Sequence, residues 1–340
     1  MGKEFKHLSI EKVENLIKDN GLPRFRAGQI LSWVYDKNVS SYDEMTNLPK
    51  TIREQLSTIA PLSKPSIINK QVSNDGSRKY LLEFSDGIFA ETVGMPYDDG
   101  RLSVCVSSQA GCAMNCSFCA TGKNGLKRNL YPGEIVDQVL AVQDDFNQRV
   151  TNVVVMGQGE PFANYDNTLA SLRIINHPKY LNIGARHITI STCGIISGIE
   201  KLSQEPEQFT LAVSLHSSIQ ETRDKLMPAV VNQPLGDLRE ALIAYAEKTG
   251  RRFSFEYALM KGVNSSVNHL EALHQYCKGL LCHVNLIPLN EIEDSPFKPV
   301  SKRELLLWQE TLEDQGISCS IRNSRGSDIA GACGQLAAKH

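Results

Sequence analysis

Hydrophobic and polar residues change their spacing twice along the chain, which divides it into three regions. From residue 8 to about 58, apolar residues recur at helical spacing, as in Leu8–Ile17 and Arg26–Tyr35. Ser9 is a suitable N-cap for the first helix, and Asn20-Gly21-Leu22-Pro23 ends it. A third element opens at Ser41–Met45. We therefore expect a small helical domain over residues 1–60.

The second region, residues 61–97, has strand character. Its apolar runs are short and are separated by Asn74-Asp75-Gly76 and Asp86-Gly87, which are typical hairpin signals. We predict strands at Ser66–Ile68, Lys79–Phe84 and Ile88–Val93. This region is expected to form a β extension that leads into the main domain.

From residue 98 to 340, short apolar runs alternate with longer runs of helical spacing. The predicted strands are Leu102–Ser107, Asn152–Met156, His187–Ser191, Thr210–Ser214, Phe253–Leu259 and His283–Ile287. The predicted helices are Pro132–Asn147, Asn167–Asn176, Ile196–Gln204, Leu235–Lys248, Val267–Cys277 and Lys302–Leu312. Six strand–helix units indicate an α/β domain whose parallel sheet closes partly or fully into a barrel.

Residues that could carry chemistry follow the predicted strands, at the edge where such folds place their active sites. They are the loop Gly111–Cys119 after the first strand, Gly157-Gln158-Gly159-Glu160 after the second, Ser191 on the third, Ser214-Leu215-His216 after the fourth, and Asn290 after the sixth. Gly159 allows a close backbone approach, and Glu160 offers a carboxylate. A Gly-x-Gly-Glu sequence can equally be a plain turn at a strand end.

Composition narrows the class of protein. The chain has 340 residues, 41% hydrophobic content and a net charge of −2, which argues against wholesale electrostatic binding of nucleic acid but leaves room for a local basic face. No apolar run approaches the length of a membrane span, and residues 1–7 lack a signal-peptide core. Nine cysteines, most of them scattered, do not resemble a secreted disulfide framework. We expect a cytoplasmic protein.

Three of the cysteines lie in a C-x3-C-x2-C pattern: Cys112, Cys116 and Cys119. Three thiolates on one loop can hold three irons of a [4Fe-4S] cluster and leave the fourth iron open for chemistry. Gly111 and Asn115 tolerate the left-handed backbone that such a loop needs.

Other interpretations of the three cysteines remain. They could bind zinc, with Cys105 or a histidine as the fourth ligand, or they could be unrelated buried cysteines. A four-cysteine ferredoxin site is disfavoured because the run contains no fourth cysteine at the usual short spacing.

Several motifs together resemble one known family. The cysteine pattern, with Phe118 before its last cysteine, is the signature of the radical S-adenosylmethionine (SAM) superfamily. The chain is similar to the RlmN/Cfr family of RNA adenine methyltransferases at Ser107–Cys112, Met156–Pro161, Ser214–His216 and Arg325–Leu336. The resemblance covers almost the whole chain and implies a partial (βα)6 TIM-like barrel of the radical SAM type with a small N-terminal helical accessory domain.

The resemblance also implies cofactors and the residues that bind them. A [4Fe-4S] cluster would be held by Cys112, Cys116 and Cys119. SAM would be bound by Gly159, Glu160, Ser191, Ser214, Leu215, His216 and Asn290. Gln158 stands where many relatives have an apolar residue, which puts the local packing in question.

The chemistry of this family requires two further cysteines. Carbon 2 of adenine is too electron-poor to attack the methyl group of SAM, so a carbon radical must be delivered to it. In the family, one SAM methylates a cysteine, a second SAM yields the radical that activates this methyl group, and another cysteine releases the product as a disulfide forms. By resemblance, Cys333 in the glycine-rich C-terminal segment is the methyl carrier and Cys105 is the resolving cysteine. Each of them could otherwise be a small buried residue.

Other residues take roles from the same resemblance or remain in the core. Glu91 aligns with a glutamate proposed as acid/base near the substrate, although a solvent-exposed surface glutamate is the alternative. Cys193, Cys277, Cys282 and Cys319 match no family role, and we expect them to pack in the core.

Basic residues that could contact RNA phosphates form two sets. Those near the expected mouth of the site are Lys123, Lys127, Arg128, Arg322 and Arg325. Those of the helical domain are Arg24, Arg26, Lys37 and Lys50, for which a solvated helical surface is an equal alternative.

The favoured hypothesis is methylation of adenine C2 in 23S rRNA, and of the adenosine beside the anticodon in some tRNAs. Methylation at C8 of the ribosomal adenine is the alternative within the family, and a zinc-stabilised RNA-binding protein without catalysis is the alternative outside it. A flavodoxin- or ferredoxin-type electron donor, a monomeric state and no membrane association complete the expectation.

Overall fold

The computed structural model describes residues 4–123, 125–293 and 295–337. The expectation that residues 1–7 lack a signal-peptide core includes residues 1–3, which lie outside these ranges. Within the ranges, no helix is both long enough and apolar enough to cross a membrane.

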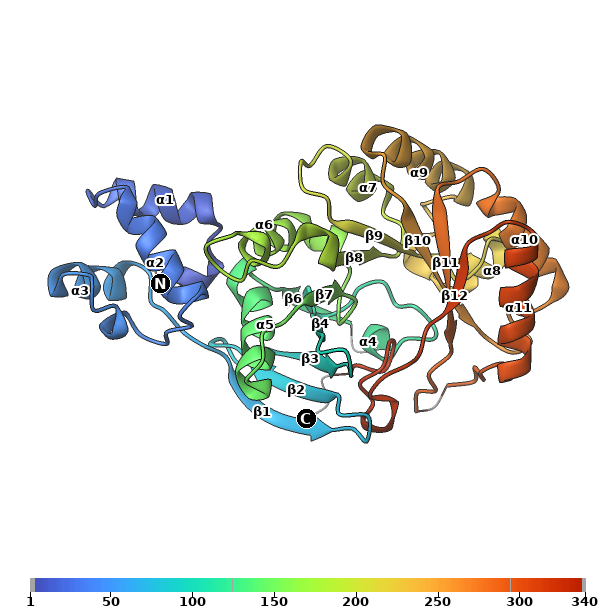
Figure 1. The fold of residues 1–340 in the computed structure, drawn as a ribbon, viewed down its shortest axis with the longest axis horizontal. Coiled ribbons are helices and arrows are strands. Elements are labelled where there is room, and N and C mark those ends of the chain that lie inside the picture. Colours follow the sequence, from blue (N-terminus) through green and yellow to red (C-terminus); the bar gives the residue numbers. More distant parts are fainter. Residues whose placement is uncertain (1–3, 124, 294, 338–340) are drawn as a thin grey trace.

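A single curved sheet of ten strands forms the centre of the molecule (Figure 1). Its strand order is β1-β2-β3-β4-β7-β8-β9-β10-β11-β12. The first three pairings are antiparallel, and all pairings from β4 to β12 are parallel. The antiparallel strands are β1 (Ser66–Val72), β2 (Arg78–Glu83) and β3 (Phe89–Pro96). The parallel strands are β4 (Leu102–Cys105), β7 (Asn152–Val155), β8 (Ile188–Thr192), β9 (Thr210–Ser214), β10 (Phe253–Leu259), β11 (Cys282–Pro288) and β12 (Cys319–Ile321).

The predicted α/β fold with six strand–helix units is confirmed, and the boundaries agree closely with the sequence pattern. The helices of this region are α5 (Pro132–Phe146), α6 (Tyr165–Asn176), α7 (Ile196–Leu202), α8 (Gln220–Leu226), α9 (Leu235–Thr249), α10 (Val267–Cys277) and α11 (Lys302–Asp314). Among the parallel strands and helices named above, β12 and α8 were not predicted. β12 adds one more parallel strand after the sixth unit, and its three residues are too few to show a period. The sequence of α8 is almost entirely polar and shows no apolar stripe.

Both predicted hairpins between the antiparallel strands are present. Gly76 and Gly87 have φ values of +82° and +75°, which residues with a side chain rarely adopt. Their amides donate to the Ser73 and Phe84 carbonyls at 3.0 and 2.9 Å, which closes the two turns.

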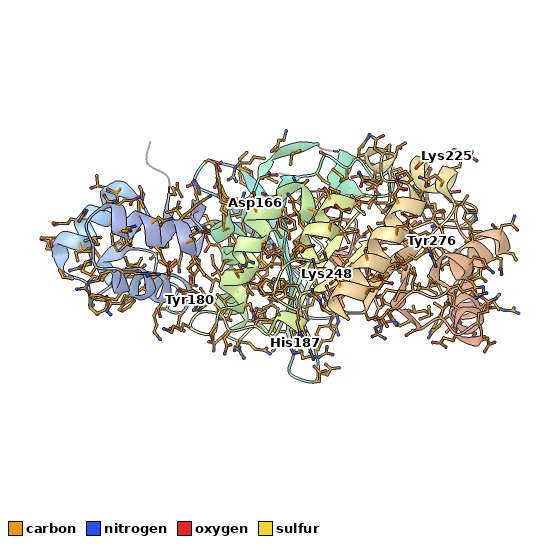
Figure 2. All side chains as sticks on the ribbon, turned by 90° about the horizontal axis from the view of Figure 1, so that it is seen from above. Asp166, Tyr180, His187, Lys225, Lys248 and Tyr276 are labelled. Carbon is orange, nitrogen blue, oxygen red and sulfur yellow. The ribbon has the colours of Figure 1, made fainter. Side chains whose placement is uncertain are left out.

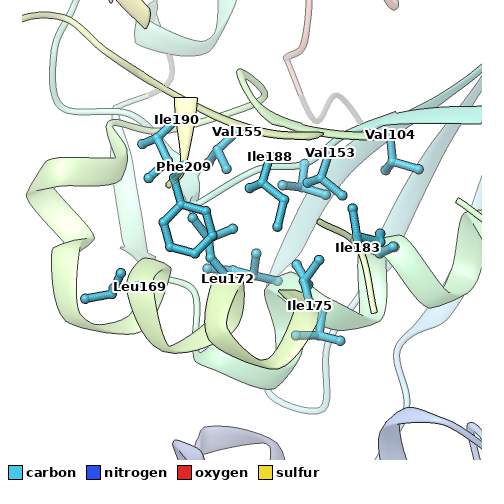
Figure 3. Close-up of a cluster of buried hydrophobic side chains, with 14 of the residues drawn as sticks. Val104, Val153, Val155, Leu169, Leu172, Ile175, Ile183, Ile188, Ile190 and Phe209 are labelled. Atoms are coloured by element: carbon cyan, nitrogen blue, oxygen red, sulfur yellow. The ribbon is translucent and has the colours of Figure 1, made fainter. Parts of the chain in front are cut away.

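The main core lies between the sheet and the helices that cover its outer face. Figure 3 shows part of it, where Leu172 and Ile175 of α6 face Val153 of β7 and Ile188 of β8. All four side chains are fully buried. This packing fixes the outer layer and leaves the carboxyl ends of the parallel strands free to carry polar groups.

The N-terminal helices form a separate lobe at one end of the molecule (Figure 1). They are α1 (Ile10–Asp19), α2 (Phe25–Tyr35) and α3 (Lys50–Ile59), with short 3-10 turns at Phe5–His7 and Tyr42–Glu44. The Ser9 hydroxyl accepts a hydrogen bond from the Lys12 amide at 3.3 Å, so the predicted N-cap is confirmed. Tyr180, labelled near this junction in Figure 2, lies 6.1 Å from the ring of Tyr35 in α2.

A buried ion pair joins this lobe to the barrel. Lys6 donates to the Asp137 carboxylate of α5, and their side chains are 2% and 5% exposed. A Cβ on Gly133, one turn earlier in α5, would lie 2.7 Å from the backbone of Lys6, so only glycine allows this close approach. The His7 ring stacks on Tyr131 at 3.7 Å. The first residues of the lobe are therefore held on α5 by charge, shape and stacking together.

We predict that Lys6→Met destabilises the protein by about 3–5 kcal/mol, because it leaves the Asp137 carboxylate buried without its partner. Urea unfolding measures this. The double variant Lys6→Met/Asp137→Leu should recover most of the loss. Lys225→Met serves as the control, because its ion pair with Glu221 is solvent-exposed and should contribute nothing measurable. A Lys6→Met protein as stable as the parent would show that the pair does not hold the lobe.

Candidate active site

The cysteine loop, Gly111–Cys119, lies between the two strands of a small antiparallel hairpin. This hairpin pairs β5 (Gln109–Gly111) with β6 (Leu126–Asn129), and α4 (Ala120–Lys123) follows the loop. Gly111 and Asn115 have φ values of +77° and +49°, as the sequence predicted. A Cβ on Gly111 would lie 2.0 Å from the Gly125 carbonyl oxygen, so this position accepts only glycine.

A cavity at the carboxyl edge of the parallel strands collects most of the predicted site residues; we call it the cysteine cavity. Residues predicted from the sequence that line it are Cys112, Cys116, Cys119, Gly159, Glu160, Ser191, Ser214, His216, Asn290 and Cys333. Leu215 does not line it, because its fully buried side chain packs into the main core.

The three thiols of the loop are available to bind a cluster. Among the described residues, no group of three or more His, Cys, Asp or Glu side chains converges on a point that could hold one metal ion. Cys112, Cys116 and Cys119 nevertheless line one cavity and are not disulfide-bonded. In an iron–sulfur cube each thiolate binds a different iron, so the thiols need not converge on one atom. Three thiols of one loop that border one cavity therefore fit a [4Fe-4S] cluster.

Burial also changes the ionisation of the loop thiols. Burial raises the pKa of Cys112 to about 11, and burial and the neighbouring thiols raise the pKa of Cys116. Thiols in such a place resist ionisation unless a metal replaces their protons.

Gly159 and Glu160 form one wall of the cysteine cavity. Gly159 has a φ of +100°, and a Cβ there would lie 2.6 Å from the Gln109 side chain. The Glu160 carboxylate accepts hydrogen bonds from the Phe162 amide at 2.9 Å and the Cys193 amide at 2.7 Å. Burial raises the pKa of this carboxyl group.

Gln158 packs without conflict, although the sequence put this position in question. Its side chain is 1% exposed, and its carbonyl oxygen accepts from the Glu91 amide at 3.1 Å. Its main-chain carbonyl accepts from the Ser108 amide at 2.8 Å. A polar side chain is tolerated here because it joins β3 to the strand end that carries Gly159.

His216 is held as a neutral ring. Its Nδ1 accepts from the Ala258 amide at 3.0 Å, so the ring proton lies on Nε2. Burial, assisted by the nearby Arg223 guanidinium, lowers the pKa of His216 to about 3. The edge of the ring meets Phe118 of the cysteine loop with centroids 4.6 Å apart. His216 can therefore act as a fixed neutral donor toward the cavity.

The C-terminal segment 326–337, which we call the tail, closes the cysteine cavity. The Gly334 carbonyl accepts from the Ala120 amide at 2.8 Å, and the Leu336 carbonyl accepts from the Thr121 hydroxyl at 2.7 Å. Asn290 donates to the Cys333 carbonyl at 3.1 Å. These contacts place Cys333 in the same cavity as the three loop thiols.

Cys105, at the end of β4, lies close to Cys333. It packs against Leu336 of the tail, and its thiol is buried. Burial, and then the Cys333 thiol, raise the pKa of Cys105 to about 12, while the Arg322 guanidinium opposes the shift. Although water reaches Cys333 through the cavity, the surrounding protein raises the pKa of its thiol, again against Arg322.

Arg322 and Glu256 were not predicted as parts of this centre. Arg322 lines the cavity and donates to the Glu256 carboxylate at 3.2 Å and to the Met156 sulfur at 3.3 Å. Glu256 is 3% exposed and also accepts from Asn285 at 2.8 Å. A charged residue inside the apolar run Phe253–Leu259 was the one sequence signal that could have drawn attention to Glu256.

Glu91 lines a second, adjacent cavity rather than the cysteine cavity. The second cavity includes Lys79, Gln335 and Ala337, so the tail separates the two spaces. The buried Glu91 carboxylate pairs with Lys79 at 3.2 Å and accepts from the Ala337 amide at 2.7 Å.

The structure removes two residues from the predicted RNA-contacting set near the mouth. Arg128 is bound to Asp86 and Glu134, and Arg322 is paired with Glu256, so neither guanidinium is available to phosphate. Lys123 and Lys127 are exposed. Arg325 donates to the Asp75 carbonyl at 3.4 Å.

The helical-domain set lies largely on the surface. Arg24, Lys37 and Lys50 are exposed, whereas Arg26 is half-buried and donates to Gln29 at 2.8 Å.

All four cysteines expected in the core are buried in hydrophobic clusters, and Cys193, in a smaller cluster with Met227 and Met260, also borders the site. Cys277, Cys282 and Cys319 belong to the main core. Cys193 lines the cysteine cavity, with its sulfur 3.4 Å from that of Met114.

Comparisons with known proteins agree with this geometry. Residues 106–273 match the family model described as the radical SAM superfamily, and residues 4–62 match that of the ribosomal RNA large subunit methyltransferase N-terminal domain. Proteins from Bacillus cytotoxicus and Bacillus thuringiensis, each named "Probable dual-specificity RNA methyltransferase RlmN", are 47% identical over 335 residues, covering 98% of this chain and 92% of theirs.

Solved structures give the same result for the fold. A crystal structure of a radical SAM methyltransferase from Sphaerobacter thermophilus superposes with a TM-score of 0.93 at 44% identity and covers 99% of this chain and 100% of that one. SuiB of Streptococcus suis, bound to S-adenosylmethionine, shares the fold at a TM-score of 0.50 and 16% identity over 68% of this chain and 53% of its own.

We predict that Arg322→Met slows alkylation of Cys333 by iodoacetamide and moves its pH profile to higher pH. The guanidinium favours the thiolate, so its removal raises the pKa of the thiol. Peptide mass spectrometry of the tail measures the labelling rate. Arg325→Met, three residues along, is the control and should leave the profile in place. An unchanged profile in Arg322→Met would show that Arg322 does not act on Cys333.

Proposed function

The chain belongs to the RlmN family of radical SAM RNA methyltransferases, and on that premise we propose that it methylates carbon 2 of an adenine in 23S rRNA, at the peptidyl-transferase centre. We also propose that it methylates the adenosine 3′ to the anticodon in some tRNAs. The relatives' names describe a dual-specificity RNA methyltransferase, which supports two RNA substrates. The supporting observation is that Cys333 lines the cavity of the loop thiols while Cys105 packs against the same tail.

The proposal assigns both cofactors to the cysteine cavity. Cys112, Cys116 and Cys119 would hold the [4Fe-4S] cluster. Gly159, Glu160, Ser191, Ser214, His216 and Asn290 would bind SAM, with Leu215 contributing through its backbone. When bound, the cluster supplies the electron for SAM cleavage, and SAM supplies the methyl group and the hydrogen-abstracting radical.

The chain's own residues would transfer the methyl group. Cys333 accepts it on sulfur, because its thiol faces the cavity and Arg322 favours the thiolate. After the carbon has joined the base, the Cys105 sulfur attacks the Cys333 sulfur. The bond between Cys333 and the carbon would break, its electron pair would pass to that carbon, which takes up a proton to become the methyl group, and a disulfide would form. Arg322 favours the ionised form of both thiols, so it assists both steps.

Glu91 would receive the proton lost from the base. A carboxylate within hydrogen-bond reach suits this role. In this structure the Ala337 amide and Lys79 occupy the carboxylate. Movement of the tail, which Gly331 and Gly334 allow, would release it toward the second cavity.

RNA would approach across the exposed Lys123 and Lys127 and the helical lobe. An adenine inside folded RNA must leave its stack to reach the cavity. We propose that the protein works as a monomer in the cytoplasm with a flavodoxin- or ferredoxin-type electron donor.

Replacement of Cys333 and replacement of Cys105 should stop the reaction at different steps. Cys333→Ala should lose methyl transfer completely and keep the absorbance of its cluster, because the methyl group has no acceptor. Cys105→Ala should accumulate enzyme covalently attached to RNA, visible on a denaturing gel. Cys319→Ala, in the core, is the matched control and should behave as the parent. Methyl transfer by Cys333→Ala would refute the carrier role.

The product identifies the site on the base. When the protein is expressed in a host that lacks its own methylase, mass analysis of digested RNA should show 2-methyladenosine in 23S rRNA and in tRNA. The vector without the gene is the control. An 8-methyladenosine product would contradict the proposed C2 specificity and support the alternative branch of the chemistry.

A further inference from the structure

A fully buried arginine without a counter-charge lies behind the cysteine loop. Arg223 of α8 is 0% exposed and makes one side-chain hydrogen bond, from Nη2 to the Cys193 carbonyl at 2.6 Å. Its Nε and Nη1 atoms are buried and have no hydrogen-bond partner. In the part of the chain that the structure describes, Arg223 forms no ion pair within 4.0 Å. A buried guanidinium in this state strongly destabilises a protein unless an anion compensates it.

Two carboxylates in the neighbourhood of Arg223 are already engaged. Asp224 accepts from Gln220 at 2.7 Å. Glu160 accepts from the Cys193 amide, so its carboxylate binds the N–H of the residue whose carbonyl Arg223 binds. Neither carboxylate pairs with the guanidinium.

The cysteine loop, whose thiolates would carry negative charge, is bound to the helix that carries Arg223. The last turn of α8 is attached to this loop, since the Leu226 carbonyl accepts from the Ser117 amide at 2.9 Å and from its hydroxyl at 3.3 Å. Arg223 also binds the Cys193 carbonyl, and the Cys193 sulfur lies 3.4 Å from the sulfur of Met114 in the same loop. The Arg223 guanidinium is therefore held near the loop by α8, and it does not line the cysteine cavity.

We propose that Arg223 is a positioning residue for the redox step, whose fixed charge raises the reduction potential of the cluster held by Cys112, Cys116 and Cys119. A cluster bound by three thiolates carries a net negative charge, and one-electron reduction makes it more negative. A cation in a surrounding of low dielectric constant stabilises the reduced form more than the oxidised form. The inference rests on the proposed function, because it needs the cluster to be present.

A purely structural role is the competing explanation. Arg223 holds the Cys193 carbonyl, and a Cβ on Gly194 would lie 3.0 Å from Nη2, so the side chain also supports this turn. A structural role predicts loss of cluster content or of stability, but not a shift in the potential of a cluster that is fully assembled.

The test is an anaerobic redox titration of the reconstituted holoenzyme, followed by the electron paramagnetic resonance signal of the reduced cluster. Iron and sulfide are measured first in every protein. Arg223→Gln keeps a donor for the Cys193 carbonyl and removes the charge. Arg223→Lys keeps the charge. Arg251→Gln is the matched control, because this guanidinium also binds main-chain carbonyls, of Glu207 and Phe209, but lies at the opposite end of β10 from the cavity.

We expect Arg223→Gln to make reduction at least tenfold less favourable, which is a shift of about 59 mV to lower potential for one electron. Arg223→Lys should stay near the parent, and Arg251→Gln should equal it. An assembled Arg223→Gln cluster with the parent's potential would overturn the inference and leave the proposed function intact. Failure of the parent itself to bind iron and sulfide would instead refute the proposed function.

A second variant covers the case in which Arg223→Gln does not fold. Leu238 meets the same face of Gly194 as the guanidinium, with its methyl carbon 3.1 Å from the position of a Cβ there. Leu238→Glu places a carboxylate beside Arg223 and compensates its charge in place. It should lower the potential in the same direction, and an unchanged potential in this variant would also contradict the inference.

Discussion

Two hydrogen bonds, from the Ala120 amide to the Gly334 carbonyl and from the Thr121 hydroxyl to the Leu336 carbonyl, hold the tail on the helix that follows the cysteine loop. Everything proposed for the chemistry depends on them, because they bring Cys333 to thiols that are more than two hundred residues away in the chain. Further hydrogen bonds to the tail come from Asn290, which donates to the Cys333 carbonyl, and from the Ala337 amide, which donates to Glu91. A segment held in this way can be ordered in one state and released in another without disturbing the sheet.

Much of the fold could be predicted because its elements obey simple patterns. The parallel strands are apolar runs bounded by turn residues, and the helices between them have a clear apolar stripe. β12 escaped prediction because a three-residue strand is defined only by its pairing with β11. α8 escaped because its one fully buried charged residue, Arg223, contributes nothing to an apolar period. In both cases tertiary contacts, rather than local sequence, decide the structure.

The site was predictable to the extent that strand ends define it. Residues directly after parallel strands must meet at one edge, which brings Ser191, Ser214 and His216 together. The pairing of Arg322 with Glu256 depends instead on the register of β12 against its neighbours, which the sequence does not display. Arg322, which its sequence position assigned to RNA contact, thus lies instead with Cys105 and Cys333.

The central claim is that the transferred carbon passes through Cys333. The most direct test incubates the protein anaerobically with SAM that carries a deuterated methyl group, first without RNA and then with it, and follows the tail peptide by mass spectrometry. The account predicts that the label appears on Cys333 and on no other cysteine, and that it leaves this residue when RNA is added under reducing conditions. RNA that acquires the label while Cys333 stays unlabelled throughout would contradict it.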